Sequence, residues 1–295
     1  MFFGGKNILV TFVPKEAATL QNINNMQYHI SAPTKIDTTI ALPASKSISN
    51  RAMIIHALSG GGTLPVNLSD CDDTEVIRHA LEHSPQTVDI KAAGTAMRFL
   101  TAYFAATPCE HTITGTERMK QRPIGPLVDA LRFLGADIEY LGEEGFPPLH
   151  IRGRQLDGGH VEIPGNVSSQ YISALLMIGP ALKNGLELKM TGDIVSRPYI
   201  ELTLWMMREF GAEADWSEAD TVSVRPKPYT RRAYTIESDW SSASYWYEML
   251  ALCGDSESSI RLTGLYDGSK QGDSVVKYIF SLLGIKTVFE SKEEG

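Results

Sequence analysis

A repeat with a period of about 75 residues most constrains how this chain folds. Segments rich in β-forming residues end in Thr-Gly three times, at Gly115, Gly192 and Gly264, which lie 77 and 72 residues apart. A small or hydroxyl-rich turn followed by an apolar segment of helical length precedes each of them. Because self-similarity at a fixed spacing indicates repeated structural units, the sequence predicts several similar modules of helices and strands.

The second half of each unit repeats as well, as a helix, a glycine and a strand. The glycines are Gly135, Gly211 and Gly284, at the C-cap position where a positive φ favours glycine. A shorter unit precedes these three, so the chain holds four modules, each with a β-rich strand after its first helix. Residues 26–42 alternate apolar and polar positions, which predicts a strand pair before the first helix. The predicted class is α/β, with helices packed together and sheets outside.

The four turns that open the apolar helices carry polar and basic residues. They are KSISNR at 46–51, GTAMR at 94–98, SSQY at 168–171 and SSASY at 241–245. Ser45, Ser47 or Ser49 can cap the first helix, and the helices of one domain are expected to gather their N-terminal turns on one face. Cations near these starts oppose the helix dipole, which favours a bound anion. These cations are Lys46, Arg51, Arg98, Arg122 and Arg197.

Composition excludes several classes of protein. The chain has 295 residues, of which 43% are hydrophobic and 21% charged, which suits about two globular domains. The formal net charge of −8 argues against non-specific nucleic-acid binding, and no apolar run is long enough to span a membrane. Cys71, Cys109 and Cys253 lie far apart without metal-ligand spacing, which predicts free thiols in the cytoplasm. Residues 1–25 lack signal-peptide features and are interpreted as an uncertain extension before Met26.

Seven segments, taken in chain order from Met26 onward, carry a specific family resemblance. They are PASKSISNRA, AAGTAMRFL, RMKQRPIGPLVDAL, VSSQYISALLM, DIVSRPYIELTL, DWSSASYW and KQGD. Together they resemble the 5-enolpyruvylshikimate-3-phosphate synthases, or 3-phosphoshikimate 1-carboxyvinyltransferases. The resemblance implies two domains of three βαβαββ modules each, with the active site between them at the helix N-termini.

The family's reaction follows from the same resemblance. It transfers the enolpyruvyl group of phosphoenolpyruvate to the 5-hydroxyl of shikimate 3-phosphate and releases phosphate, on the route to chorismate and aromatic amino acids. The resemblance implies no metal or organic cofactor, no nucleic-acid or membrane partner, and a monomer at full length.

The resemblance also assigns residues to the two ligands. Shikimate 3-phosphate is expected to contact Lys46, Ser47, Arg51, Ser168, Ser169, Gln170, Ser196 and Tyr199. Phosphoenolpyruvate is expected to contact Lys46, Gly94, Thr95, Arg122 and Gln170. In physical terms Gly94 lets a ligand approach the backbone closely, and Arg122 can bind a carboxylate or phosphate through two N–H groups. Lys46 provides a positive charge for the negative charge that develops during transfer.

The domain prediction and the expected activity depend on how much of the family pattern is present. Residues 45–238 are expected to form a complete second domain of three modules. Residues 26–44 and 239–295 are expected to form an incomplete first domain with one module of three and exposed apolar helix faces. The family's carboxylates for proton transfer match no position here, so the chain is expected to be a C-terminally truncated synthase with little or no activity alone. Ala92 also replaces the Asn that commonly opens the family's glycine turn.

Two alternatives remain open at the level of the sequence. An enolpyruvyl transferase acting on UDP-N-acetylglucosamine would use a cysteine as its acid, but Cys109 lacks the surroundings of that loop. A non-catalytic anion-binding repeat protein is the other alternative. It predicts that Lys46, Arg122 and Gln170 can be exchanged without loss of ligand affinity.

Overall fold

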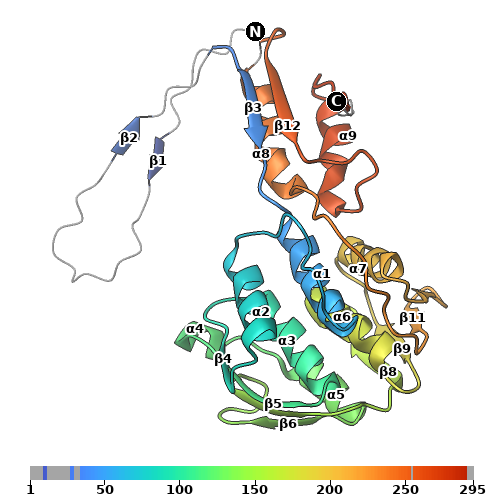
Figure 1. Ribbon diagram of the computed structural model, residues 1–295. Helices are drawn as coiled ribbons and strands as arrows, with labels where there is room; N and C mark the ends of the chain where they lie inside the picture. The colour runs from blue at the N-terminus through green and yellow to red at the C-terminus, as the bar shows by residue number, and fades with distance from the viewer. Residues whose placement is uncertain (1–8, 12–26, 30–33, 254, 291–295) are drawn as a thin grey trace, which may run out of the picture.

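The computed structural model describes residues 9–11, 27–29, 34–253 and 255–290. It contains two separate hydrophobic cores, which belong to the two bodies seen one above the other in Figure 1. The larger core draws on residues from Ala44 to Ile236. The smaller core consists of Leu42, Trp240, Ala243, Tyr247 and Val276.

Two modules of the larger body have identical topology. The elements of one are β4 (Thr87–Asp89), α3 (Gly94–Ala106), β5 (Cys109–Thr114), α4 (Glu117–Lys120), α5 (Gly125–Phe133), β6 (Asp137–Tyr140) and β7 (Leu149–Gly153). Those of the other are β8 (Gly159–Pro164), α6 (Ser169–Ile178), η1 (Gly179–Ala181), β9 (Leu186–Thr191), α7 (Arg197–Glu209), β10 (Ala214–Trp216) and β11 (Thr221–Val224). The sheets have the orders β4-β5-β7-β6 and β8-β9-β11-β10, and only the first pair of each is parallel. The predicted βαβαββ repeat is therefore confirmed in these two modules.

The first module departs from that plan. It contains α1 (Lys46–Leu58) and α2 (Asp72–His83), after which β4 of the next module begins at Thr87. The prediction of a strand after its first helix is wrong, because the segment between α1 and α2 forms only an isolated bridge between Val66 and Thr235. Three successive glycines at 60–62 have positive φ angles, and a proline follows at 65, so this segment does not adopt regular extended backbone.

The smaller body combines segments from far apart in the chain. It contains β3 (Asp37–Ala41), α8 (Trp240–Cys253), β12 (Ser259–Thr263), η2 (Gly272–Val275) and α9 (Val276–Ser281). Strand β3 pairs with β12 in parallel, as β4 does with β5. The predicted strand pair within 26–42 is wrong, because β2 (Gln27–His29) pairs with β1 (Leu9–Thr11) instead. Most of the predicted extension at 1–25 lies outside the described residues.

The glycines that define the repeat lie where the sequence predicts them. Gly115, Gly192 and Gly264 each follow the last residue of a strand, namely of β5, β9 and β12. Gly135, Gly211 and Gly284 have φ angles of 97°, 82° and 88°, which side chains with a Cβ rarely adopt. The module boundaries therefore follow from local backbone requirements.

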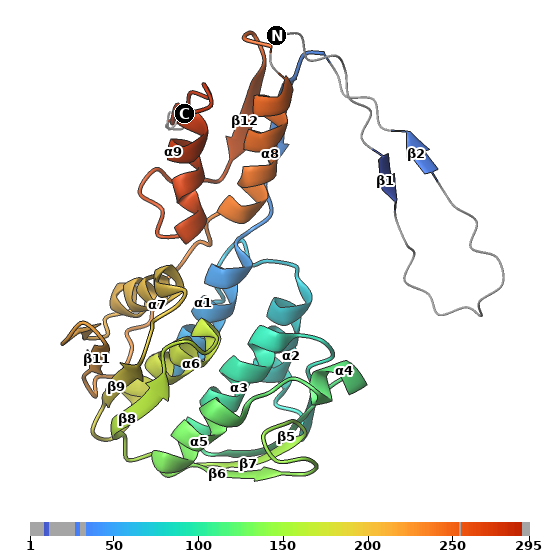
Figure 2. The same ribbon diagram turned by 180° about the vertical axis from the view of Figure 1, so that it is seen from behind.

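Helices α8 and α9 of the smaller body leave large apolar side chains in contact with solvent. Leu252 on α8 is 73% exposed and Tyr278 on α9 is 65% exposed, which confirms the expectation of exposed apolar helix faces. Figure 2 shows α8 and α9 beside β12 in this body, above the larger one. The domain boundaries at 44/45 and 238/239 stay a prediction, and the separation of the two cores supports them. Within the part of the chain that the structure describes, no helix has the length and apolar character needed to cross a membrane.

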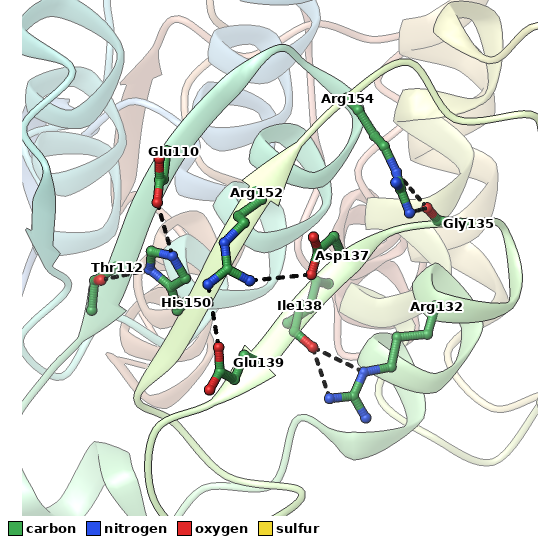
Figure 3. A network of polar contacts seen from close by, with 10 residues as sticks. All are labelled: Glu110, Thr112, Arg132, Gly135, Asp137, Ile138, Glu139, His150, Arg152 and Arg154. Carbon is green, nitrogen blue, oxygen red and sulfur yellow. Dashed lines mark hydrogen bonds and ion pairs between the residues drawn. The ribbon is translucent and has the colours of Figure 1, made fainter.

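Charged side chains form a network on the outer face of the sheet that contains β7 (Figure 3). Arg152 lies 3.5 Å from Asp137 and 3.4 Å from Glu139, both on the neighbouring strand β6. His150 lies 3.1 Å from Glu110 on the other side. Because these carboxylates and Arg152 are about half exposed, each pair is expected to contribute less than about 1 kcal/mol.

We predict that stability depends on the helical interior and not on this network. Arg152→Ala should lower the free energy of unfolding by less than about 1 kcal/mol. Leu175→Ala, in a fully buried position of α6, should lower it by about 2–5 kcal/mol because it leaves a cavity. Urea unfolding followed by circular dichroism measures both, and equal effects would contradict this assignment.

Candidate active site

The first turns of four helices form the candidate site. Helix α1 packs against α3, α6 and α7, while α6 packs against both α3 and α7. None of these four first turns contains an acidic residue. Their free backbone N–H groups and helix dipoles therefore provide partial positive charge that no carboxylate within the turns offsets. Such helix starts are suited to binding anions.

The carboxylate of Asp73, at the start of α2, joins two of these helix starts. Its Oδ2 lies 2.5 Å from Nζ of Lys46, the first residue of α1. Its Oδ1 accepts hydrogen bonds from the N–H groups of Thr95 and Ala96, at 2.8 and 3.2 Å, in the first turn of α3. Asp73 is buried, whereas half of the Lys46 side chain is exposed. The ammonium is thus tethered at the site without being enclosed.

Sequence reasoning missed Asp73. The only signal was the acidic first turn of α2, with Asp72, Asp73 and Glu75, and acidic residues are ordinary in a first helical turn. The carboxylate instead serves the neighbouring helix, a contact that spacing along one helix cannot show.

Gln170 connects the starts of α3 and α6. Its Nε2 donates a hydrogen bond to Oγ1 of Thr95 at 3.1 Å. Ser168 caps α6 by accepting a hydrogen bond from the Gln170 N–H, and Ser169 is buried beside it. The structure therefore brings Gln170 and Thr95 together. The sequence assigns Gln170 to both ligands and Thr95 to phosphoenolpyruvate.

Arg122 lies directly against the backbone of Gly94. A Cβ placed on Gly94 would overlap the guanidinium of Arg122, so any larger residue here requires this flexible side chain to move. Arg98 links the two segments by donating to the carbonyl oxygens of Gly94 at 2.7 Å and Pro123 at 3.4 Å. Arg98 is buried and Arg122 is exposed. Arg122 is therefore available to a ligand, while Arg98 supports the turn.

Arg51 occupies the centre of the helix packing. It is 3% exposed and donates hydrogen bonds to Oγ1 of Thr203 (2.7 Å), the carbonyl oxygen of Ser47 (2.9 Å) and Oγ of Ser173 (3.0 Å). It thereby ties α1 to α6 and α7. Burial lowers the pKa of Arg51 to about 10, so it remains charged at neutral pH. All three partners are neutral, and an anion bound nearby would stabilise this buried charge.

The two residues predicted from the start of α7 are both exposed. Ser196, the N-cap, has a φ of 57°, an uncommon conformation for a residue with a side chain. Such strained residues cluster at functional sites. Tyr199 is 40% exposed, and burial of the rest of its ring raises the pKa of its hydroxyl. Its carbonyl oxygen accepts a hydrogen bond from Thr203, which also binds Arg51.

Two expectations about the helix starts are wrong. No serine side chain caps α1: Ser45 occupies the N-cap position but its side chain makes no cap hydrogen bond, and Ser47 and Ser49 lie inside the helix. Ser49 instead accepts a hydrogen bond from the Ser69 N–H.

Arg197 does not join the other cations. Its guanidinium stacks on the ring of Trp216, 4.0 Å from the centroid, and faces Glu201 one turn along α7. The ring and the carboxylate compensate its charge locally.

Comparison with known proteins identifies the family. The family model described as EPSP synthase (3-phosphoshikimate 1-carboxyvinyltransferase) matches residues 78–294. The chain belongs to the EPSP synthase family. A 3-phosphoshikimate 1-carboxyvinyltransferase of Bacteroides fragilis is 61% identical over 264 residues, which are 90% of this chain and 64% of that protein. The protein of the same name from Shewanella halifaxensis is 38% identical over 275 residues, covering 84% and 64% of the two chains.

A solved structure supports the fold assignment. EPSP synthase from Acinetobacter baumannii superimposes with a TM-score of 0.67 at 22% identity, covering 79% of this chain and 57% of that chain. The fold is therefore that of an EPSP synthase. The chain spans 64% of the length of the two curated relatives described above.

We predict that Asp73 stabilises the start of α3 as a cap supplied by another helix. Asp73→Ala removes the acceptor of two N–H groups and should lower the free energy of unfolding by about 1–2 kcal/mol. Asp73→Asn keeps one acceptor oxygen and should cost less than half as much. Urea unfolding measures both, with Asp129→Ala on the exposed side of α5 as control. Equal losses for Asn and Ala would contradict the capping role.

Proposed function

We propose that this chain supplies the helix-start side of an active site that transfers an enolpyruvyl group from phosphoenolpyruvate to the 5-hydroxyl of shikimate 3-phosphate. The observation that carries the proposal is the convergence of four helix starts without acidic residues, beside Lys46 and the exposed Arg122. Both proposed ligands carry a phosphate and a carboxylate, which such a site favours. The names of the curated relatives support the same reaction.

The proposed binding site for shikimate 3-phosphate follows α1, α6 and α7. Its members are Lys46, Ser47, Arg51, Ser168, Ser169, Gln170, Ser196 and Tyr199. Hydroxyl and N–H groups at the start of α6 would donate to anionic oxygens of the ligand. Because Arg51 is buried, its side chain cannot wrap around a ligand. It would act mainly through its positive charge and by orienting Ser47, whose carbonyl oxygen accepts a hydrogen bond from it.

The proposed binding site for phosphoenolpyruvate follows α3. Its members are Lys46, Gly94, Thr95, Arg122 and Gln170. During transfer, the 5-hydroxyl oxygen bonds to the substituted carbon of phosphoenolpyruvate as the hydroxyl loses its proton and the methylene carbon gains one. The tetrahedral intermediate then loses phosphate together with a proton from the new methyl group, which restores the double bond. Lys46 would stabilise the negative charge near this carbon. The proposal assigns no general acid or base to this chain, since both oxygens of Asp73 already bind protein groups.

The structure does not favour the transferase that uses a cysteine acid. The thiol of Cys109 donates to the carbonyl oxygen of Phe104, and burial raises its pKa. These contacts fit a structural thiol. We further propose two domains divided at 44/45 and 238/239, and a full-length protein that is a monomer. We also propose a cytoplasmic location, where Cys71, Cys109 and Cys253 stay reduced.

We predict that Lys46 contributes directly to binding of shikimate 3-phosphate. Calorimetric titration of the chain in phosphate-free buffer should show saturable binding, and Lys46→Ala should weaken it about tenfold or more, because a charge-assisted contact is lost. Lys120→Ala is the matched control, since Lys120 pairs with Glu117 on α4. If both variants bind as tightly as the parent chain, the assignment of Lys46 is wrong.

We predict that Gly94→Ala weakens phosphoenolpyruvate binding and leaves shikimate 3-phosphate binding nearly unchanged. The added methyl group would displace Arg122, which lies 2.2 Å from its position. Titration with phosphoenolpyruvate at saturating shikimate 3-phosphate should show at least about a tenfold loss. Gly268→Ala serves as control, because a Cβ there meets no atom within 4 Å. A loss confined to shikimate 3-phosphate would contradict the division of the two sites.

A further inference from the structure

Glu237 has an unusually complete set of hydrogen bonds outside the ligand-facing residues. Its carboxylate is 5% exposed. Oε1 accepts hydrogen bonds from the Trp240 indole N–H and the Tyr266 backbone N–H, each at 2.9 Å. Oε2 accepts from Ser269 Oγ at 2.7 Å and Gln271 Nε2 at 2.9 Å. One buried carboxylate thus orders the loop from Tyr266 to Gln271.

The backbone of Glu237 lies where the chain passes between the two bodies. Its carbonyl oxygen accepts a hydrogen bond from the N–H of Ser45 at 2.9 Å, one residue before Lys46 and α1. Two residues further, the Asp239 N–H donates to the carbonyl oxygen of Pro43 at 2.9 Å. The two chain passages are therefore paired with each other, and Glu237 fixes the outgoing one next to the start of α1.

The loop that Glu237 orders also reaches the start of α7. Gln271 is 6% exposed, accepts a hydrogen bond from the Trp240 N–H and donates one to the carbonyl oxygen of Ser238. The next residue, Gly272, approaches Pro198 so closely that an added Cβ would lie 3.0 Å from the Cβ of Pro198. Pro198 belongs to the first turn of α7. Glu237 is therefore connected to the start of α1 through its backbone carbonyl group, and to the start of α7 through its carboxylate and the loop that it orders.

We infer that Glu237 is a positioning residue that holds the starts of α1 and α7 in register across the junction of the two bodies. The inference rests on the proposed function, because it deepens the shikimate 3-phosphate site to which Lys46 and Tyr199 are assigned. Removing a buried acceptor leaves its donors unsatisfied, which is more costly than losing exposed contacts. Loss of the Glu237 carboxylate should therefore disturb both the start of α1 and the start of α7.

The experiment compares the parent chain with Glu237→Gln and a matched control. Glutamine keeps one acceptor oxygen, which suits the N–H donors of Trp240 and Tyr266, and its amide nitrogen then meets the donor Nε2 of Gln271, so that hydrogen bond is lost. Asp255→Asn is the control, because Asp255 also accepts from a backbone N–H and a serine hydroxyl, but at 255–258 in a turn before β12. Circular dichroism establishes that each variant is folded, and Ser269→Ala provides a milder variant should Glu237→Gln unfold.

Hydrogen exchange of the ligand-free chain is the first measurement. Glu237→Gln should speed exchange about tenfold in peptides covering 44–50 and 196–202, as well as in 264–272. Asp255→Asn should leave all three regions unchanged. Faster exchange in 264–272 alone would mean a local structural role and would overturn the inference, as would the same pattern in Asp255→Asn.

Calorimetric titration with shikimate 3-phosphate is the second measurement. Glu237→Gln should raise the Kd about tenfold, and Asp255→Asn should not change it. An unchanged Kd for Glu237→Gln would overturn the inference if the parent chain binds. If the parent chain does not bind, the proposed function fails, and the exchange pattern alone then decides whether Glu237 positions the two helix starts.

Discussion

The joint packing of α1, α3, α6 and α7 is the constraint on which the rest of the structure depends. Burying these helices against one another brings their first turns together, and with them partial positive charges that repel. Asp73, supplied by the neighbouring helix α2, offsets part of this charge while satisfying the start of α3. The remaining charge, including that of the buried Arg51, is what an anionic ligand would compensate. The positive charge that would favour ligand binding therefore lowers the stability of this region, and the same few residues determine both.

The repeat could be predicted from the sequence because it depends on local chemistry. Glycine is required where φ is positive, as at Gly135 and Gly211, and strands ending in Thr-Gly recur with it. The exposed site residues followed from the turns that open the helices. The capping by Asp73 and the hydrogen bond from Arg51 to Thr203 could not be predicted, since these partners lie 22 and 152 residues away. Ser49 likewise bonds to a distant backbone group instead of capping its own helix.

The pairing of β3 with β12 explains why the smaller body was harder to predict. In the complete modules the first strand directly precedes its helix, but here β3 lies far before α8 in the sequence, with the whole larger body between them. The chain consequently passes between the bodies twice, and the two passages pair beside Lys46. The periodic pattern alone gives the modules, and the joining of residues 26–44 with 239–295 was expected only from the family resemblance. The same arrangement places the Glu237 network next to the helix starts.

A crystal structure of this chain with shikimate 3-phosphate would test the central claim most directly. The account predicts electron density for the ligand at the starts of α1, α6 and α7, with its anionic groups within hydrogen-bond distance of Lys46, the Ser168–Gln170 turn and the first turn of α7. Density for the ligand elsewhere, for example in the groove between α5 and β8 lined by Phe133 and His160, would contradict it. So would density that leaves the helix starts unoccupied at a saturating ligand concentration.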